Sequence, residues 1–280
     1  MQRYYLILLL LIATLSAAPS SLVAKDKKKV HVTHDFAPDP LPTSSKARPD
    51  THGPRLRQPR AFGMTLTTDK EGGVQGIDVS HYQGDINWKE VAKTGIPKFV
   101  YVKATEGKSL VDERYHDYFA QAKRQGFKVG SYHFFRPGVD VETQYRLFIG
   151  NIDVKSQDLL PLIDVEIISG AASVEMFQRT LLTFCRLVAH AFNGQKPVIY
   201  TGKNFYDKYI ASNNQLRQYQ FMIAAYQDQQ PQLANGDDYL IWQYTGKGRV
   251  GGIKGNVDRS RFVGVHSLSE ILVNQKRIPK

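Results

Sequence analysis

Two acidic residues stand two positions apart directly after an apolar stretch. The stretch covers residues 159–163, and Asp164 and Glu166 follow it with Val165 between them. On a β-strand, side chains two positions apart lie on the same face, so both carboxylates would point the same way. Buried acids are costly unless they are hydrogen-bonded or retained for chemistry. Such a pair can cleave a glycosidic bond, with one carboxyl protonating the leaving oxygen and the other stabilising positive charge; a solvated strand end is the alternative interpretation.

Further acids and aromatic residues stand at or near the ends of other apolar segments. The acids are Asp78, Glu106 and Asp258. The aromatic residues are Tyr132, Phe134, Tyr200, Tyr226 and Trp242. In a β/α barrel the strand ends converge on one rim, where the active site is built. Carboxylates surrounded by aromatic rings predict a sugar-binding cleft, although an aromatic residue in a strand can equally serve packing.

The segments that must position these residues alternate between apolar runs and amphipathic stretches from Gly73 onward. Expected strands cover residues 74–79, 99–103, 128–134, 159–165, 197–200, 221–225, 239–244 and 256–262. Expected helices cover residues 88–93, 114–125, 141–150, 174–192 and 205–210. Continuous apolar strands separated by helices favour a parallel sheet buried on both faces. The pattern predicts an α/β fold, an irregular (β/α) barrel similar to a TIM barrel, with reduced helices near its C-terminal end.

The first 70 residues have a different composition. Residues 1–24 combine a short basic start, an apolar run and small residues, which predicts a signal peptide, with an uncleaved N-terminal anchor as the alternative. Residues 25–70 hold six of the 13 prolines and little apolar periodicity, which predicts a basic disordered linker. We therefore expect the catalytic domain at residues 71–280. We also expect an exported protein that is periplasmic, in the cell envelope or extracellular.

The linker carries much of the net charge. The 280 residues include 37 Lys and Arg against 26 Asp and Glu, a formal charge of +11. Residues 25–60 contain nine basic and four acidic residues, a net of +5. Such a segment favours electrostatic association with an anionic wall or membrane surface. Nucleic acid is not an expected partner, because the basic residues gather in a proline-rich segment without interleaved aromatic residues.

Missing motifs exclude several enzyme classes. Cys185 is the only cysteine, so neither an intramolecular disulfide nor a cysteine-rich zinc site can form. The sequence contains no HExxH metalloprotease motif and no GxSxG serine-hydrolase motif. We expect no cofactor and no metal.

Seven short motifs occur in order along residues 73–264. They are GIDVS at 76–80, KATEG at 103–107, GSYHF at 130–134, DVE at 164–166, IYT at 199–201, IWQY at 241–244 and NVD at 256–258. Together they resemble the family 25 glycoside hydrolases, the muramidase type of lysozyme. The resemblance implies an irregular β/α barrel. It also implies hydrolysis of the β-1,4 bond between N-acetylmuramic acid and N-acetylglucosamine in peptidoglycan.

The resemblance also implies roles for individual residues. Glu166 corresponds to the general acid and Asp164 to its stabilising partner. Asp78 and Asp258 correspond to two further cleft carboxylates, and Glu106 to a supporting acid. The chain departs from the family where members often have Leu-Trp-Ile-Ala before Tyr226, because it has Phe-Met-Ile-Ala at 221–224. That change puts one packing or sugar contact in doubt.

Two alternatives stay open at this level. The reaction could use the substrate's own N-acetyl group, a carboxylate nucleophile about 5 Å from the acid, or a water with carboxyls about 6.5–9.5 Å apart. The chain could also be a catalytically silent module that only binds peptidoglycan glycan strands. A monomer is expected in either case.

Overall fold

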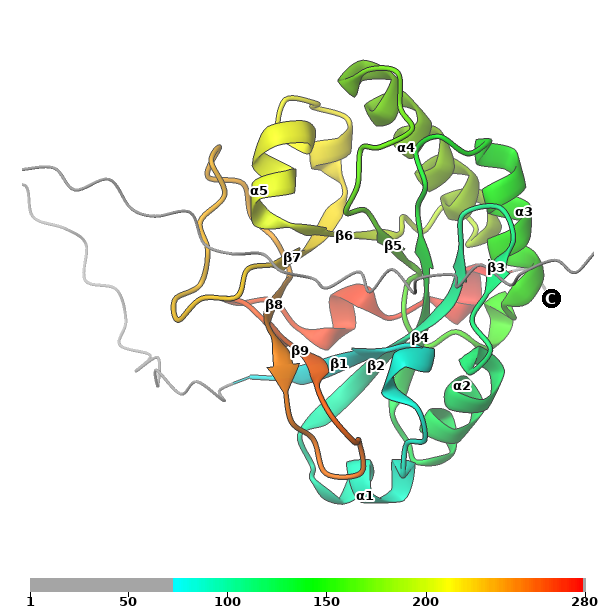
Figure 1. Ribbon diagram of the computed structural model, residues 1–280, viewed down its shortest axis with the longest axis vertical. Helices are drawn as coiled ribbons and strands as arrows, with labels where there is room; N and C mark the ends of the chain where they lie inside the picture. Colours follow the sequence, from blue (N-terminus) through cyan, green and yellow to red (C-terminus); the bar gives the residue numbers. More distant parts are fainter. Residues whose placement is uncertain (1–72, 279–280) are drawn as a thin grey trace, which may run out of the picture. The chain divides into compact units, whose positions relative to one another are not determined.

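The computed structural model describes residues 73–278, which form one barrel with helices around it (Figure 1). The predicted signal segment and the whole predicted linker lie outside the described residues. The nine strands of the described part are β1 (Gln75–Val79), β2 (Pro97–Glu106), β3 (Leu110–Val111), β4 (Lys128–Phe134), β5 (Leu162–Asp164), β6 (Val198–Gly202), β7 (Gln220–Ala224), β8 (Ile241–Gly248) and β9 (Val257–Phe262).

The sheet closes on itself. The strand order is β1-β9-β8-β7-β6-β5-β4-β2-β3, and β2 also pairs with β1. All strands except the short β3 therefore belong to a closed barrel, and β3 only extends the end of β2 as a hairpin. The predicted barrel and its eight strands are confirmed.

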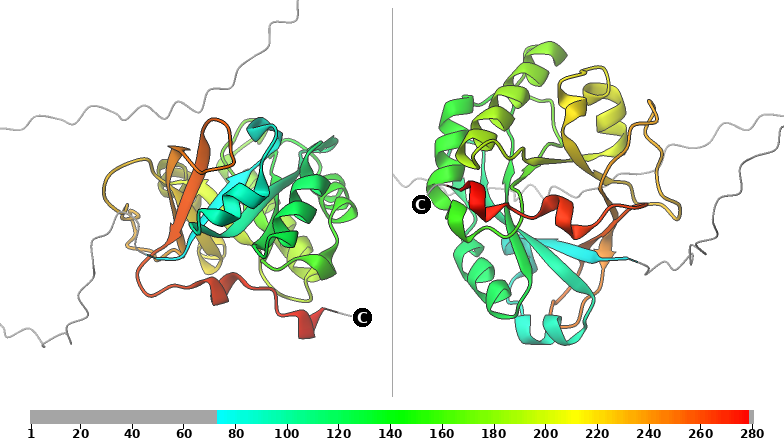
Figure 2. Two further views of the ribbon diagram at one scale, coloured as in Figure 1. Left: turned by 90° about the horizontal axis from the view of Figure 1, so that it is seen from below. Right: turned by 180° about the vertical axis from the view of Figure 1, so that it is seen from behind.

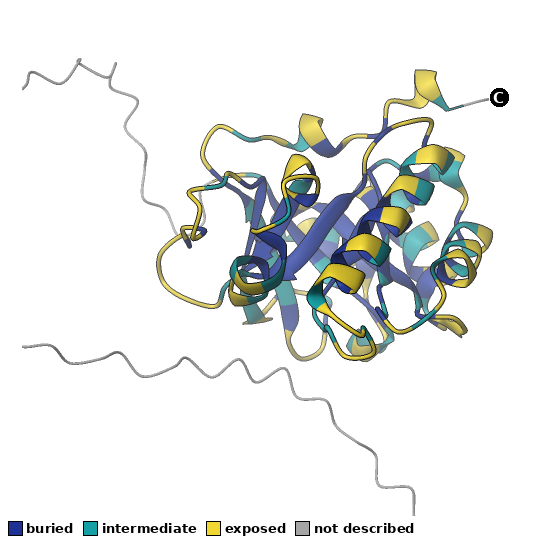
Figure 3. Cartoon of the chain, turned by 90° about the horizontal axis from the view of Figure 1, so that it is seen from above, coloured by how far each residue is buried: buried dark blue, intermediate teal, exposed yellow. Residues whose placement is uncertain are grey.

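The helices lie outside the barrel. They are α1 (Trp88–Lys93), α2 (Tyr115–Arg124), α3 (Val141–Asn151), α4 (Val174–Ala191) and α5 (Lys203–Phe205). Within the described residues these α-helices lengthen from α1 to α4, and only the short α5 follows α4. α5 continues into a single π-helical turn, Tyr206–Ile210. In the described residues no helix lies between β7 and β8 or between β8 and β9, so the predicted loss of helices is confirmed. Figure 3 shows buried strands inside and helices whose outer faces are exposed.

One strand runs against the prediction. We expected a parallel sheet, but β9 is antiparallel to both of its neighbours, β1 and β8. The physical reason is the connection between β8 and β9, which spans only residues 249–256. A parallel return needs a crossover of about a dozen residues or more, so this short connection forces a hairpin.

The barrel interior is filled by aromatic rings from β2. Phe99 and Tyr101 are fully buried, and their rings meet edge to face with centroids 6.2 Å apart. A Cβ on Gly76 would lie 2.2 Å from the Phe99 ring, and one on Gly130 would lie 2.7 Å from the Tyr101 ring. Two glycines on neighbouring strands thus make room for the two rings.

The C-terminal segment crosses the end of the barrel at which the parallel strands begin (Figure 2). The Leu160 N–H donates to the Ile271 carbonyl at 2.7 Å, and the Val273 N–H donates to the Asp158 carbonyl at 2.8 Å. Ile271 is fully buried. The segment therefore closes the barrel floor and leaves the opposite rim for chemistry.

Candidate active site

The first pair of acids at the rim comes from β1 and β9. Asp78 and Asp258 are direct partners in the antiparallel register of these strands. Because β9 runs backward, its beginning meets the end of β1, which brings Asp258 to the same rim as Asp78. Like charges directly opposite each other destabilise a sheet. The pairing of these two acids therefore lowers the stability of the fold, and a catalytic role would explain why both are present.

The second pair comes from β5 and the loop after it. Asp164 is the last residue of β5, and its register partners are Phe134 on β4 and Tyr200 on β6. Glu166 follows two residues later and is half-buried. Repulsion from Glu166 acts on both Asp78 and Asp164, so the four acids share one electrostatic environment. We call Asp78, Asp164, Glu166 and Asp258 the rim carboxylates.

Burial and crowding change the acidity of this set. Burial first, and then repulsion from Asp258, raise the pKa of Asp78 well above its ordinary value. Burial and the neighbouring Glu166 do the same for the pKa of Asp164, which is only 8% exposed. Within the described residues, Oδ1 of Asp164 is buried without a hydrogen-bond partner. The rim carboxylates therefore hold protons to a higher pH than isolated carboxyls do, and because they repel one another they do not all ionise together.

Gln243 on β8 connects the rim carboxylates to two tyrosines. Its Nε2 donates to Asp78 at 3.0 Å, while its Oε1 accepts from the Tyr200 hydroxyl at 2.9 Å and the Tyr226 hydroxyl at 2.8 Å. The side chain is 1% exposed. Sequence reasoning did not single out Gln243; the available signal was a polar residue between two aromatic residues in an otherwise apolar strand.

Glu106 has a different environment from the rim carboxylates. Its carboxylate accepts from Lys103 Nζ at 2.7 Å and forms an ion pair with Arg136. Burial alone would raise its pKa, but the hydrogen bonds from Lys103 and Arg136 outweigh this and hold the pKa below its ordinary value. Glu106 is therefore an ionised anchor for two cations, which suits a supporting role better than proton transfer.

Lys103 links this anchor to the acids. It is 7% exposed, and its charge opposes the rise in the pKa of Asp164. Lys103 and Arg136 also lie over the Phe134 ring, at 5.4 and 4.7 Å from its centroid. The two cations that hold Glu106 thus also hold this ring in place. Neither cation was among the site residues predicted from the sequence: Lys103 stands in the KATEG motif without a predicted role, and Arg136 lies in the loop after β4, outside every motif.

A buried histidine fixes the loop that carries Arg136. His133 Nδ1 lies 2.7 Å from Thr105 Oγ1, and its Nε2 lies 3.3 Å from Gln144 Oε1. Gln144 in turn accepts from the Arg136 N–H at 2.9 Å and donates to the Arg136 carbonyl. Burial lowers the pKa of His133 to about 4, so the ring is neutral near pH 7.

The predicted aromatic contacts divide into two groups. Tyr132 and Phe134 are half-buried and Tyr226 is 44% exposed, so these three rings are open to solvent at least in part. Tyr200 is 8% exposed and reaches the site through its hydroxyl. The expectation for Trp242 is corrected: it is 2% exposed, and its indole N–H donates to the Ala225 carbonyl at 2.7 Å. It packs instead, because its neighbour Gln243 takes the face toward Asp78.

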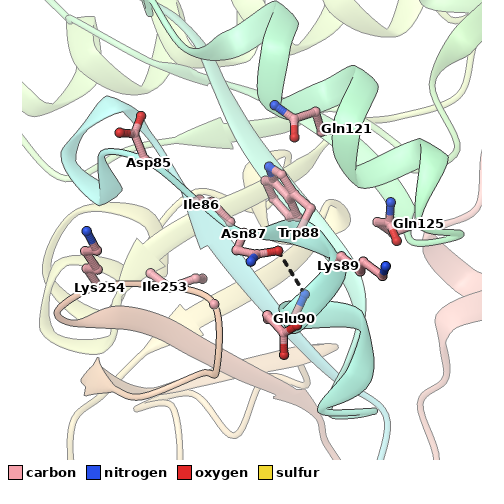
Figure 4. A pocket seen from close by; sticks show the side chains of 11 residues that line it. Asp85, Ile86, Asn87, Trp88, Lys89, Glu90, Gln121, Gln125, Ile253 and Lys254 are labelled. Carbon is pink, nitrogen blue, oxygen red and sulfur yellow. Dashed lines mark hydrogen bonds between the residues drawn. The ribbon is translucent and has the colours of Figure 1, made fainter.

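A separate hollow of about 640 Å³ lies between the beginning of α1, the helix α2 and the loop between β8 and β9 (Figure 4). None of the rim carboxylates lines it. Its lining includes Asn87, whose side chain caps α1 by accepting from the Glu90 N–H at 3.2 Å. The hollow marks where α1 meets its neighbours, and the chemistry remains at the rim.

Known proteins match this chain over the barrel. A sequence model of the family described as glycosyl hydrolases family 25 matches residues 77–253. Lysozyme M1 of Streptomyces globisporus is 34% identical over 227 residues, which cover 76% of each chain. The YegX protein of Escherichia coli K12 is 33% identical over 211 residues, covering 74% of this chain and 76% of its own. Among solved structures, a bacterial lysozyme from Streptomyces coelicolor has a TM-score of 0.63 at 31% identity, covering 71% of this chain and 95% of that one.

Proposed function

The chain belongs to glycosyl hydrolase family 25, and we propose that it is an exported lysozyme that hydrolyses the β-1,4 bond between N-acetylmuramic acid and N-acetylglucosamine in peptidoglycan. Membership makes it a glycoside hydrolase of the muramidase type. The bond, the roles of individual residues and the export are the parts that we propose.

The proposed reaction uses the rim carboxylates in separate roles. Glu166 donates a proton to the glycosidic oxygen as the bond breaks, and Asp164 stabilises the positive charge that develops on the sugar. Asp78 and Asp258 supply the other two acidic side chains of the rim, from β1 and β9. Tyr132, Phe134, Tyr200 and Tyr226 would contact the glycan, either through ring faces or through hydroxyls.

One observation carries the proposal. Burial and mutual repulsion raise the pKa of Asp78 and of Asp164, so the rim retains bound protons at a pH where isolated carboxyls have lost theirs. A glycosidase needs such a proton at the moment when the leaving oxygen departs. Crowded, poorly solvated acids are costly to folding, and glycosidic cleavage gives them a use.

The substrate is a polymer in the cell envelope, which agrees with the expected export. Within residues 73–278 the structure has no helix that is both long and apolar enough to cross a membrane. We propose that residues 1–24 direct export and that the basic residues 25–60 hold the enzyme near anionic wall components.

Deleting residues 25–60 should reduce wall association and its salt dependence; unchanged association would contradict this role.

Replacing the proposed proton donor tests the catalytic assignment. We expect Glu166→Gln to slow the clearing of a peptidoglycan suspension by about 10²- to 10⁴-fold, because an amide cannot donate the proton. Glu142→Gln is the matched control, since Glu142 is an exposed residue of α3 that pairs with Arg146. Thermal unfolding of both variants checks that each is folded. Full activity of folded Glu166→Gln would refute the assignment.

A silent binding module would behave differently in the same material. It would sediment with insoluble peptidoglycan without creating new reducing ends. The wild-type enzyme should bind peptidoglycan and create new reducing ends, and the Glu166→Gln variant should bind peptidoglycan without creating them.

A further inference from the structure

An aromatic side chain next to the rim is far more exposed than its neighbours. Tyr82 is 79% exposed, whereas Tyr226, the next most exposed aromatic residue at the rim among those described, is 44% exposed. A large ring left in water loses the free energy that burial would provide. Single exposed apolar residues are common on protein surfaces, so exposure alone assigns no role. The surroundings of Tyr82 carry the argument.

The backbone around Tyr82 is tightly held. Tyr82 lies in the 3₁₀ turn His81–Gln83, which a reciprocal capping box between Ser80 and Gln83 closes at its N-terminus. The Ser80 N–H donates to Gln83 Oε1 at 2.9 Å, and the Tyr82 N–H donates to Ser80 Oγ at 3.4 Å. These hydrogen bonds fix the backbone of the turn, so the position of Tyr82 is specified by the fold.

The ring itself rests on a second aromatic side chain that is also fixed. The centroids of His81 and Tyr82 lie 4.1 Å apart with their planes 37° from parallel. The buried carboxylate of Asp112 accepts from the His81 N–H at 3.0 Å and lies 2.7 Å from His81 Nδ1. His81 therefore supports one face of the Tyr82 ring and leaves the other face toward solvent.

The turn lies over the rim. It follows the end of β1 directly, and a fully extended stretch of four residues spans at most about 14 Å, so Tyr82 stays within that distance of Asp78. On one side Gln83 Nε2 donates to the Asn256 carbonyl at 3.4 Å, two residues before Asp258. On the other side His81 is tied to Asp112, next to β3. The turn thus bridges the strands that flank Asp78.

We propose that Tyr82 is a sugar-binding residue that stacks on a ring of the glycan strand away from the bond that is cleaved. This inference rests on the proposed function, because it takes the substrate to be a glycan bound along the rim. A rigid aromatic face with a supported back and an open front can stack on the apolar face of a pyranose ring, and it loses little conformational entropy when it does so. Tyr82 touches no reacting atom in this role, and it contributes to the binding of long strands only.

The test compares substrates of two lengths. Soluble peptide-free glycan strands, prepared from peptidoglycan with an amidase, are the long substrate, and a tetrasaccharide of the same repeat is the short one. For Tyr82→Ala we expect KM for the long strands to rise about three- to tenfold with kcat unchanged, since a contact away from the cleaved bond binds substrate and transition state equally. The tetrasaccharide should be cleaved with kcat/KM within about twofold of wild type, because the proposed contact with Tyr82 lies beyond the sugars that this short substrate places around the cleaved bond.

Two further variants separate stacking from a structural effect. Tyr82→Phe keeps the ring and should retain the wild-type KM for long strands. Val265→Ala removes another exposed apolar side chain, which is 96% exposed and follows the end of β9, and it should change neither parameter. An unchanged KM of Tyr82→Ala for long strands, or equal losses on both substrates, would overturn the inference. Wild-type enzyme that cleaves neither substrate would instead refute the proposed function.

Discussion

Asp164 is a single residue whose position in the candidate site lowers the stability of the folded protein near neutral pH. It is buried at the end of β5, beside Glu166, with one carboxyl oxygen lacking a partner among the described residues. Burial raises its pKa in the folded protein above the value in the unfolded chain. The group therefore stabilises the fold most at low pH, and this contribution is lost as the pH rises from the unfolded-state pKa toward the folded-state pKa.

The raised pKa of Asp164 predicts how its replacement changes stability. Asp164→Asn removes the charge that must be buried near neutral pH, so the variant should unfold at a higher temperature than wild type at pH 7. The difference should shrink toward pH 4, where the wild-type carboxyl is also protonated in the folded state. Activity on peptidoglycan should fall about 100-fold or more, because the charge that stabilises the transition state is gone. Thermal unfolding between pH 4 and 8 measures the first effect, and a lower unfolding temperature at pH 7 would contradict it.

Single residues were predictable where a motif surrounds them. The acids at 78, 106, 164, 166 and 258 stand at or near strand ends, and the structure places all of them at one end of the barrel. Gln243 was not predicted as a site residue, although it lies in the IWQY motif, because its role depends on Asp78, a partner 165 positions away in the chain. Trp242 was a candidate sugar contact with packing as the alternative, and its burial favours packing, because the sequence alone does not show which face of β8 points into the barrel.

Among the secondary-structure elements, the packing of β1, β2 and β4 against one another depends on two glycines. Their spacing is possible because Gly76 and Gly130 leave the volume that Phe99 and Tyr101 occupy. A methyl group at either position would have to displace a fully buried ring, which cannot move freely in a closed barrel.

The second prediction concerns this packing. Gly76→Ala should destabilise the protein by about 1–3 kcal/mol, because the new Cβ would overlap the Phe99 ring. Gly150→Ala is the matched control: this glycine lies in α3 with open space around it, and the change should stabilise by about 0.5–1 kcal/mol. Chemical denaturation of the two variants gives both values. A Gly76→Ala protein as stable as wild type would show that β1 can shift away from β2.

The local sequence pattern predicted where strands and helices lie better than it predicted the directions of the strands. The helix over residues 88–93 and the strand over 128–134 match their predicted bounds, because apolar spacing and capping residues act within a few positions. The antiparallel direction of β9 escaped prediction because the preceding strand was expected to end at residue 244, whereas β8 runs to Gly248 and leaves only a short connection. The short β3 is exposed and only two residues long, so it has no apolar pattern to detect.

At the scale of the whole molecule, the two ends of the barrel have different tasks. The C-terminal segment seals one end with buried apolar residues and backbone hydrogen bonds. The other end gathers four acids, several aromatic rings and two supporting cations. The formal charge of +11 therefore coexists with a local acidic centre, and nearly half of the excess lies in residues 25–60.

The central claim is that this acidic rim cleaves the glycan on one side of a particular sugar. Purified peptidoglycan digested with the wild-type enzyme, followed by reduction of the products and mass spectrometry, identifies the sugar at each new reducing end. We expect reduced N-acetylmuramic acid at those ends, and at least about 100-fold fewer new ends in the same time with the Glu166→Gln variant. Reduced N-acetylglucosamine at the new ends would contradict it.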